Sequence, residues 1–150
     1  MFTIGAFAII FDEQGQVLLC HRRDMDLWNL PGGGMENSEL PTDAVIREAR
    51  EETGLEVVIE RLVGVYGKPD KEELVFAFTC RIVGGQLSEM DESDACRYFS
   101  LEAIPINTPP KHVERIQDAL VDGPPIFRVQ TALSGRDLFN RLQAGTDSAR

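Results

Sequence analysis

The sequence predicts a single α/β domain, in which a β-sheet is packed between helices as an α/β/α sandwich. Segments rich in β-branched and aromatic residues are interspersed with helical segments, an order typical of this class. The chain has 150 residues, 43% of them hydrophobic and 27% charged, which is enough for one buried core. Neither an internal repeat nor a linker-like stretch divides the sequence, so residues 1–150 are interpreted as one domain.

The N-terminal part predicts a hairpin followed by a long loop. Thr3–Phe11 and Gln16–Arg22 are rich in strand-forming residues, and Asp12–Gly15 between them is a turn signal. Asp24–Asn37 predicts a loop, because it contains Pro31 and a run of glycines. The apolar N-terminus is too short to span a bilayer and lacks the charged start of a signal peptide, so neither membrane anchoring nor secretion is expected.

A helix is predicted to begin near Pro41 and to end before Gly54. Proline suits the first helical position, and Asp43 in the first turn complements the positive end of the helix dipole. Gly54 suits the left-handed position that closes a helix. An apolar stripe lies away from the acidic residues of this helix and consists of Ala44, Val45 and Ala49.

The second half of the chain predicts further strands and two helices. Segments rich in β-branched residues predict strands at Val57–Tyr66, Leu74–Val83, Ala95–Ser100 and Ile126–Val129. Helices are predicted at Lys111–Val121, where apolar residues recur on one face, and at Arg136–Leu142. Residues from about Ala144 on are expected to be frayed.

The net charge of −10 disfavours a protein that binds duplex nucleic acid, since such proteins usually carry a basic patch. A small anionic substrate is compatible with this charge, because bound cations and local arginines reverse its sign at a site. The acidity is concentrated in Gly33–Leu55, which contains six acidic and two basic residues.

The three cysteines, Cys20, Cys80 and Cys96, are odd in number and form no CxxC pair. They are therefore expected to be reduced thiols, without a disulfide framework or a zinc site. This cysteine usage and the absence of a targeting signal predict a cytoplasmic protein.

Three glutamates near the end of the first helix indicate a cation-binding site. Glu48, Glu51 and Glu52 are spaced i, i+3 and i+4, so they occupy one arc of the helix about 100° wide. Carboxylates so close together repel one another unless a cation neutralises them. Hard divalent ions such as Mg²⁺ prefer oxygen ligands of this kind, so the arrangement predicts a divalent metal site.

The residues around these glutamates resemble the signature motif of the Nudix hydrolase family. The glycine-rich lead-in Trp28–Gly33 is similar as well, and the one soft departure is Ala49, which is smaller than the usual aliphatic residue. The resemblance implies the Nudix fold, an α/β/α sandwich with a mixed β-sheet and the motif as its loop–helix–loop. The matching residues are Gly33, Glu39, Arg47, Glu48, Glu51, Glu52, Gly54 and Leu55.

The resemblance implies a pyrophosphohydrolase, a hydrolase of phosphorus-containing anhydrides that cuts a nucleoside diphosphate derivative with water as the nucleophile. It implies Mg²⁺ or Mn²⁺ as the cofactor, held by Glu48, Glu51 and Glu52. The carbonyl group of Gly32 is a further candidate ligand. One of the three glutamates is expected to deprotonate the attacking water as well.

Two further roles follow from the same resemblance. Arg47 is expected to act with the catalytic glutamates by orienting them through charge-assisted hydrogen bonds, with Glu39 as its partner. Some family members use another acid well after the motif, and Glu92 is the best candidate because it lies in an acidic loop. Its competitors in that loop are Glu89, Asp91 and Asp94, and the alternative is a loop of solvated surface charges.

Three residues ahead of the motif are candidates for substrate binding. Trp28 is a candidate for stacking on a base or ribose, although a tryptophan beside a Pro-Gly turn is often a packing residue. Arg22 and Arg23, at the end of a predicted strand, are candidates for phosphate contacts. The expected partner is a small nucleotide, with neither a nucleic-acid duplex nor a membrane. A homodimer is one candidate assembly, because family members are often homodimers.

The motif leaves the substrate open, because Nudix specificity resides in the flanking loops. ADP-ribose hydrolases of the family often carry a proline in the region after the motif, and Pro69 lies near that position. Dinucleoside polyphosphate hydrolases tend to carry a tyrosine slightly later, where this chain has Lys71 and Glu72. ADP-ribose or a nucleotide sugar is therefore ranked first, ahead of the (d)NTPs of a housecleaning enzyme. A non-catalytic nucleotide-binding sensor on the same fold is the alternative from a different class.

Overall fold

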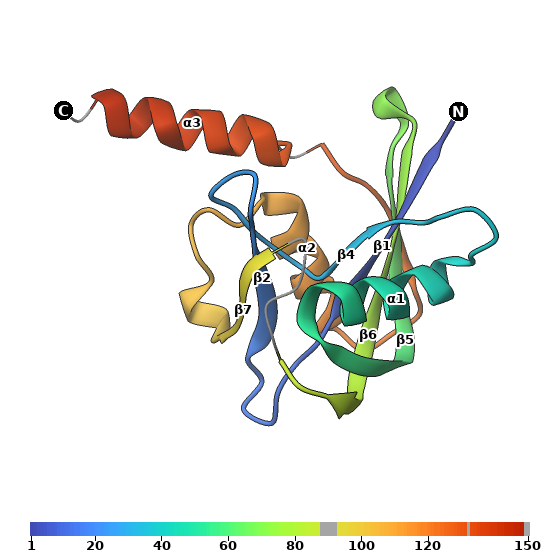
Figure 1. The fold of residues 1–150 in the computed structure, drawn as a ribbon. Helices are drawn as coiled ribbons and strands as arrows, with labels where there is room; N and C mark the ends of the chain where they lie inside the picture. Colours follow the sequence, from blue (N-terminus) through green and yellow to red (C-terminus); the bar gives the residue numbers. More distant parts are fainter. Residues whose placement is uncertain (88–92, 132, 149–150) are drawn as a thin grey trace.

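The computed structural model describes residues 1–87, 93–131 and 133–148, with the backbone alone at 93–95 and 147–148 (Figure 1). Its central sheet is made of β1 (Thr3–Ile9), β4 (Gly32–Gly34), β5 (Leu55–Lys68), β6 (Glu73–Gly85) and β8 (Ile126–Val129). The strand order is β4-β1-β6-β5-β8. β1 is parallel to β6 and β5 is parallel to β8, whereas β4 is antiparallel to β1 and β5 to β6. The predicted mixed sheet is thus confirmed.

A second sheet contains β2 (Val17–Arg22), β3 (Trp28–Asn29) and β7 (Ser93–Phe99), all antiparallel in the order β3-β2-β7. The predicted turn of the N-terminal hairpin is therefore confirmed, whereas the predicted pairing of β1 with β2 is wrong. The N–H of Asp12 donates to the carbonyl of Gln16 at 2.9 Å, but the two strands then enter different sheets. β1 already pairs with β4 on one side and β6 on the other, so no edge of it is left for β2.

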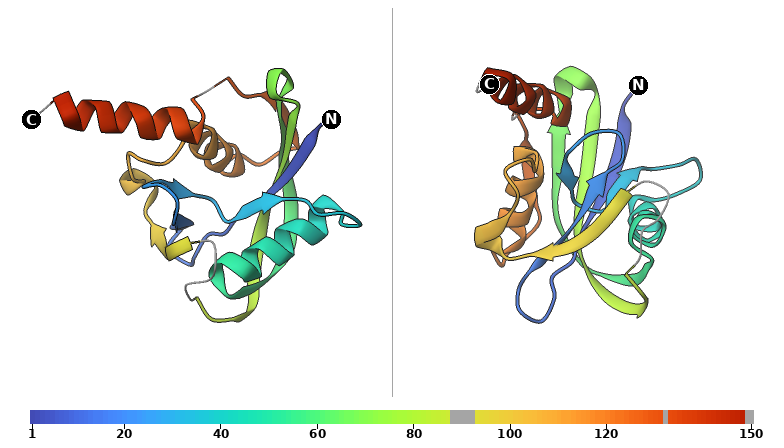
Figure 2. Two further views of the ribbon diagram at one scale, coloured as in Figure 1. Left: turned by 45° about the horizontal axis from the view of Figure 1, so that its top comes forward. Right: turned by 60° about the vertical axis from the view of Figure 1, so that its left-hand side comes forward.

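Helices α1 (Pro41–Thr53) and α2 (Pro110–Ala119) cover opposite faces of the central sheet (Figure 2). Side chains alternate along β1, so Ala6 and Ala8 face the α1 side while Phe7 and Ile9 face the α2 side. Short 3₁₀ turns follow β5 at η1 (Pro69–Lys71) and β7 at η2 (Leu101–Ala103). Two cores result, one on each face, and the predicted α/β/α sandwich is confirmed.

The first helix has the predicted ends. Gly54 has φ of 79°, the left-handed conformation, and its N–H donates to the carbonyl of Arg50 at 2.9 Å. Asp43 does more than complement the dipole, because its carboxylate accepts the N–H of Leu40 at 2.9 Å.

The last helix is longer than predicted. α3 (Gly135–Ser148) continues past Leu142 through the residues expected to fray, and it extends away from the rest of the molecule (Figures 1 and 2). Its first half is held by a small apolar cluster in which Leu138 packs with Met25 and Leu27 of the loop after β2. These contacts are distant in sequence, so the local pattern did not indicate them.

The expectation of three reduced thiols is wrong for two of them. Cys20 and Cys96 form a disulfide between β2 and β7, where the antiparallel register places them directly opposite one another. They are 76 residues apart in sequence, so their spacing did not reveal this neighbourhood. Cys80 is a buried free cysteine, and burial is the main cause that raises its pKa to about 12.

None of the helices within the described residues has the length and apolar character needed to cross a bilayer.

Candidate active site

Two glycines of β4 bring the motif loop against the sheet and the helix. Gly32 has φ of 157°, and a Cβ atom there would lie 2.4 Å from the carbonyl oxygen of Ala6. A Cβ atom on Gly33 would lie 2.7 Å from Oε1 of Glu48. The Glu48 carboxylate therefore occupies the space that the side chain of any other residue at position 33 would fill.

Arg47 is the centre of the hydrogen-bond network on α1. Its Nε and Nη2 donate to the two carboxylate oxygens of Glu39 at 2.7 and 3.0 Å, and Nη2 also donates to the carbonyl of Gly34 at 3.0 Å. Its Nη1 donates to Oε1 of Glu48 at 3.1 Å and to Oε2 of Glu51 at 3.0 Å. The predicted contact with Glu39 is present, and Arg47 ties two of the three motif glutamates to the glycine turn.

The electrostatics of this network favour the charged forms. The hydrogen bond from Arg47, with a second from the N–H of Glu36, lowers the pKa of Glu39. Hydrogen bonds to Glu39 and Glu48 raise the pKa of Arg47, chiefly that to Glu39. The ion pair between Arg47 and Glu39 therefore stays formed across the neutral pH range.

The three motif glutamates differ in exposure. Glu48 and Glu52 are 5% and 8% exposed, whereas the Glu51 side chain is 44% exposed. Oε2 of Glu52 accepts the N–H of Gly32 at 3.2 Å, so the amide of Gly32 is the group that contacts a motif glutamate. The role of the Gly32 carbonyl as a metal ligand stays a prediction.

The donor set fits a hard divalent cation. The three motif glutamates offer carboxylate oxygens, and one of these carboxylates, that of Glu48, fits against Gly33 because glycine has no side chain. Within the described residues, no group of three acidic, histidine or cysteine side chains is placed so as to hold a metal ion. Arg47 contacts two of the motif glutamates, and the amide of Gly32 contacts the third. The chemistry of the site matches the metal, and its carboxylates are pre-positioned by protein contacts.

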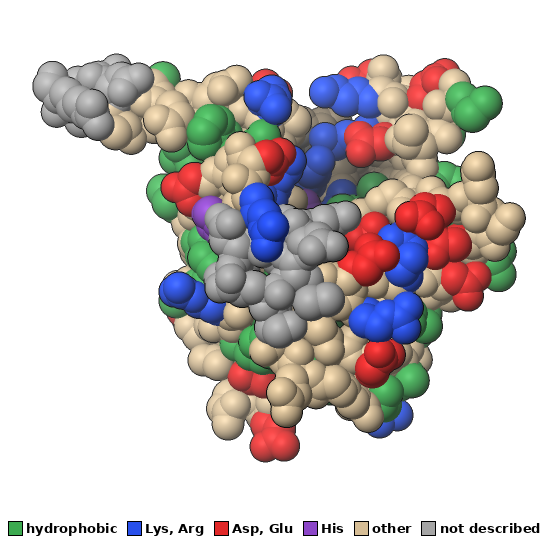
Figure 3. All heavy atoms as spheres, viewed as in Figure 1, with side chains coloured by type: hydrophobic (Ala, Val, Ile, Leu, Met, Phe, Trp, Pro, Cys, Tyr) green, Lys and Arg blue, Asp and Glu red, His purple; other side chains and the backbone are tan. Residues whose placement is uncertain are grey.

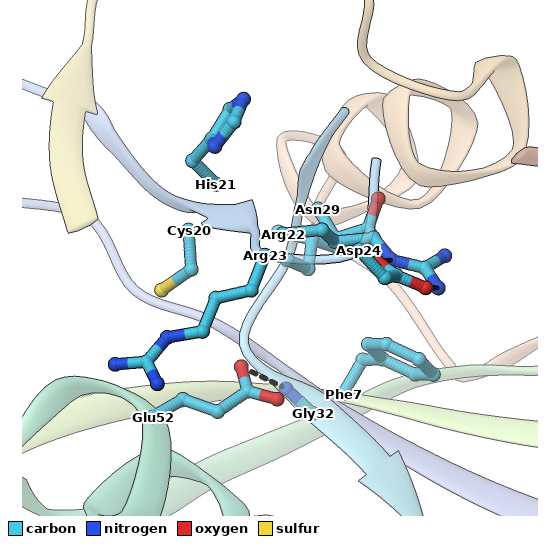
Figure 4. A pocket seen from close by; sticks show the side chains of 10 residues that line it. Phe7, Cys20, His21, Arg22, Arg23, Asp24, Asn29, Gly32 and Glu52 are labelled. Atoms are coloured by element: carbon cyan, nitrogen blue, oxygen red, sulfur yellow. Dashed lines mark hydrogen bonds and ion pairs between the residues drawn. The ribbon is translucent and has the colours of Figure 1, made fainter. Parts of the chain in front are cut away.

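A cavity of about 350 Å³ opens beside Glu52 (Figure 4). Both predicted phosphate-binding arginines line it. Arg22 is held by Asp24 through its Nε at 2.8 Å, and this contact lowers the pKa of Asp24. Arg23 extends toward the Glu52 carboxylate in Figure 4. The lining residues are Phe7, Cys20, His21, Arg22, Arg23, Asp24, Asn29, Leu30, Gly32 and Glu52.

Trp28 is not among the residues that line this cavity. Its ring packs edge-on against His21 and Phe99, with ring centroids 5.0 and 4.9 Å apart, and Arg97 lies over it. The next residue, Asn29, lines the cavity instead, because successive side chains of a strand point to opposite faces. Sequence reasoning missed Asn29 and Phe7, and strand alternation beside the glycine turn was the signal that would have found them.

The candidate further acid, Glu92, lies outside the described residues, as do Glu89 and Asp91. The backbone of Asp94 is described as part of β7, and its side chain is not. The role of an acid from this loop stays a prediction.

Comparison with known proteins decides the family. The family model for the NUDIX domain matches residues 1–120. This chain belongs to the NUDIX family. The predicted activity class, a Nudix pyrophosphohydrolase acting on phosphoanhydrides, is thereby confirmed. Nudix hydrolases generally use divalent metal ions.

Relatives of this Nudix chain differ in the substrates that their names give. A Bacillus subtilis (strain 168) protein named provisionally as an 8-oxo-dGTP diphosphatase is 34% identical over 79% of this chain and 80% of its own length. A Methanocaldococcus jannaschii ADP-ribose pyrophosphatase is 32% identical over 64% of this chain and 61% of its own. The crystal structure of an ADP-ribose pyrophosphatase from Streptococcus suis is 28% identical, with a TM-score of 0.71 over 87% of this chain and 100% of that one.

Replacing Arg47 with lysine should lower kcat about 10- to 100-fold, the range seen when a group that orients metal ligands is lost. Lysine offers one ammonium group in place of the fork that contacts Glu39, Glu48 and Glu51, so these carboxylates lose their common anchor. The measurement is kcat against metal concentration. Arg50→Lys is the matched control, since Arg50 lies on the same helix with its guanidinium 3.8 Å from Glu56. Equal rates in the two variants would contradict the orienting role.

Proposed function

We propose that this Nudix hydrolase cleaves the pyrophosphate of ADP-ribose or a related nucleoside diphosphate sugar. The observation that carries the proposal is the cavity that joins Glu52 to Arg22 and Arg23. It places two cationic side chains next to the motif, where the charge of a pyrophosphate would be neutralised. Its volume is in the range of small-ligand sites, which is roughly 300–1,000 Å³.

The side chains that line the cavity are better suited to binding a sugar than to binding a base. Most of its side chains are polar or charged, and Asn29 and Asp24 offer partners for hydroxyl groups. Phe7 is the one aromatic carbocycle among the lining residues, and Trp28 packs elsewhere, so the described lining contains no pair of such rings to enclose a base. The two ADP-ribose pyrophosphatases among its relatives agree with this choice.

The proposed roles follow from the contacts. Glu48, Glu51 and Glu52 would hold Mg²⁺ or Mn²⁺, which when bound neutralises phosphate charge and makes a coordinated water more acidic. Arg47 holds Glu48 and Glu51 in place, and Gly32 does the same for Glu52. Arg22 and Arg23 would bind the phosphates, and one motif glutamate would accept the proton of the attacking water.

Phosphate release from a panel of substrates tests this function. ADP-ribose, nucleotide sugars, dNTPs including 8-oxo-dGTP, and dinucleoside polyphosphates would be compared with Mg²⁺ and with Mn²⁺. ADP-ribose or a nucleotide sugar should have the highest kcat/KM, and a chelator should abolish turnover because the site would lose its metal. A higher kcat/KM for a dNTP would favour the second candidate, which the Bacillus subtilis relative supports. Tight binding without any turnover would identify a sensor instead.

Location and assembly were expected to be cytoplasmic and, as one candidate, homodimeric. Both stay predictions.

A further inference from the structure

Three cationic side chains lie together on the α2 side of the central sheet, at the end nearest η1. Lys68 ends β5, while Lys111 and Arg115 come from successive turns of α2. Lys68 is 8% exposed and Arg115 is 2% exposed. Burial, and then the neighbouring charges of Lys68 and Arg115, lower the pKa of Lys111 to about 8. Like charges held this close together destabilise the folded state unless an anion neutralises them, and this cost has to be explained.

Arg115 in particular has unused donors. Its Nη2 donates to the side-chain oxygen of Gln130 at 2.9 Å, and its guanidinium lies over the rings of Phe7 and Tyr66, 5.1 and 5.5 Å from their centroids. Its Nε and Nη1 are buried and have no hydrogen-bond partner among the described residues. Buried donors of a charged group that remain unpaired are strongly unfavourable, which points to a bound acceptor.

The surrounding groups include carboxylates as well as cations. The charge of Glu73 favours the protonated forms of both Lys111 and Arg115. The charge of Glu114 favours the protonated form of Arg115, and its carboxylate also accepts a hydrogen bond from the side-chain amide of Gln130. Asp118 is engaged by Tyr66 and Arg128 instead. Burial and the nearby cations keep His112 neutral by lowering its pKa. Glu73 and Glu114 are thus two carboxylates beside the three cations, and Asp70 and Asp137 line a cavity that Lys68 also lines.

This cationic cluster, defined as Lys68, Lys111 and Arg115, adjoins the active-site cavity. The Phe7 ring lines that cavity and also contacts Arg115 and His112, whose ring centroid is 5.1 Å away. Figure 3 shows a hollow in which Lys and Arg side chains gather, between the β5–β6 end of the sheet and the helices, beside the acidic side chains over α1. If a ligand bound beside Glu52 extended past Phe7, the end of the ligand farthest from Glu52 would contact the cluster.

We propose that the cationic cluster binds a further phosphate of the substrate, a phosphomonoester on the nucleoside, in addition to the scissile pyrophosphate. Three cations offer a doubly charged phosphate more donors than a sugar hydroxyl or a neutral base needs. The identification of the ligand as a substrate rests on the proposed function. The presence of an anion site does not, so the two are tested separately.

The first test uses inorganic phosphate and metal-free protein in a chelator, measured by calorimetric titration. Phosphate should bind to the native chain and to Glu51→Gln alike, and at least about tenfold more weakly to Lys111→Met and to Lys68→Met. Lys71→Met is the control, because Lys71 is an exposed lysine next to the same segment. Lys111→Met should melt no lower than the native chain, since it removes a crowded charge. Equal phosphate affinity in Lys111→Met and Lys71→Met would overturn the anion site.

The second test compares ADP-ribose with its 2′-phosphate, which differ by one phosphomonoester. The phosphorylated compound should have at least about tenfold higher kcat/KM, and Lys111→Met should erase the difference. Equal kcat/KM for both compounds in the native chain would overturn the assignment to a substrate phosphate. Failure of both compounds and of the nucleotide sugars to turn over would refute the proposed function, while the phosphate titration would still decide the anion site.

Discussion

Replacing Glu51 or Glu52 with glutamine should lower kcat by about 10²- to 10³-fold, the cost of removing one pre-positioned electrostatic group in other enzymes. Each substitution keeps the shape of the side chain and removes one negative charge from the proposed metal ligands. Glu51 is half-exposed, so its variant should fold normally. Glu52 is buried against the Gly32 amide, and glutamine retains an oxygen to accept that hydrogen bond.

The experiment separates a metal ligand from a surface charge. It measures kcat, the Mg²⁺ concentration for half-maximal rate and the melting temperature. Both variants should need more Mg²⁺, because the site has lost a ligand charge, while their melting temperatures stay close to that of the native chain. Glu56→Gln is the matched control, since Glu56 follows the same helix and lies 3.8 Å from Arg50. Near-native activity in both Glu51→Gln and Glu52→Gln would refute the metal assignment.

The part of the site that could be predicted is the part that depends on local geometry. A helix fixes the angles between residues three and four apart, so the common arc of Glu48, Glu51 and Glu52 followed from their spacing. Gly54 indicated the end of that helix, because a helix closed in this way ends on a residue with a left-handed backbone conformation. The contact between Arg47 and Glu39 came from the family resemblance, and the structure shows the two hydrogen bonds that make it.

The part that could not be predicted depends on pairings far apart in the chain. The disulfide between Cys20 and Cys96 requires the register of β2 with β7, which no local pattern gives. Asn29 lines the cavity and Trp28 does not, because the face that each one presents depends on which sheet β3 joins. The cationic cluster is the clearest case. Lys68 and Lys111 belong to different elements, and their positions in the sequence give no sign that they meet.

Replacing Gly33 with alanine should lower kcat by about 10²-fold, the effect expected when a reacting group is misplaced by about 1 Å. The new Cβ atom would lie 2.7 Å from Oε1 of Glu48 and 2.8 Å from its carboxylate carbon, so the carboxylate must move. Glu48 is buried and is held by Arg47, and its displacement would disturb the network that also positions Glu51. The free energy of unfolding should change little, because the group that must move is the far end of a flexible side chain.

The next residue provides the control. A Cβ atom on Gly34 would meet no heavy atom of the described residues within 4 Å, so Gly34→Ala should keep native activity and stability. Both variants would be compared in kcat, Mg²⁺ requirement and melting temperature. A raised Mg²⁺ requirement in Gly33→Ala alone would show that a metal ligand keeps its position only when residue 33 has no side chain. Because the two positions are adjacent in β4, equal behaviour of the two variants would show that the place of the Glu48 carboxylate beside Gly33 is not needed for catalysis.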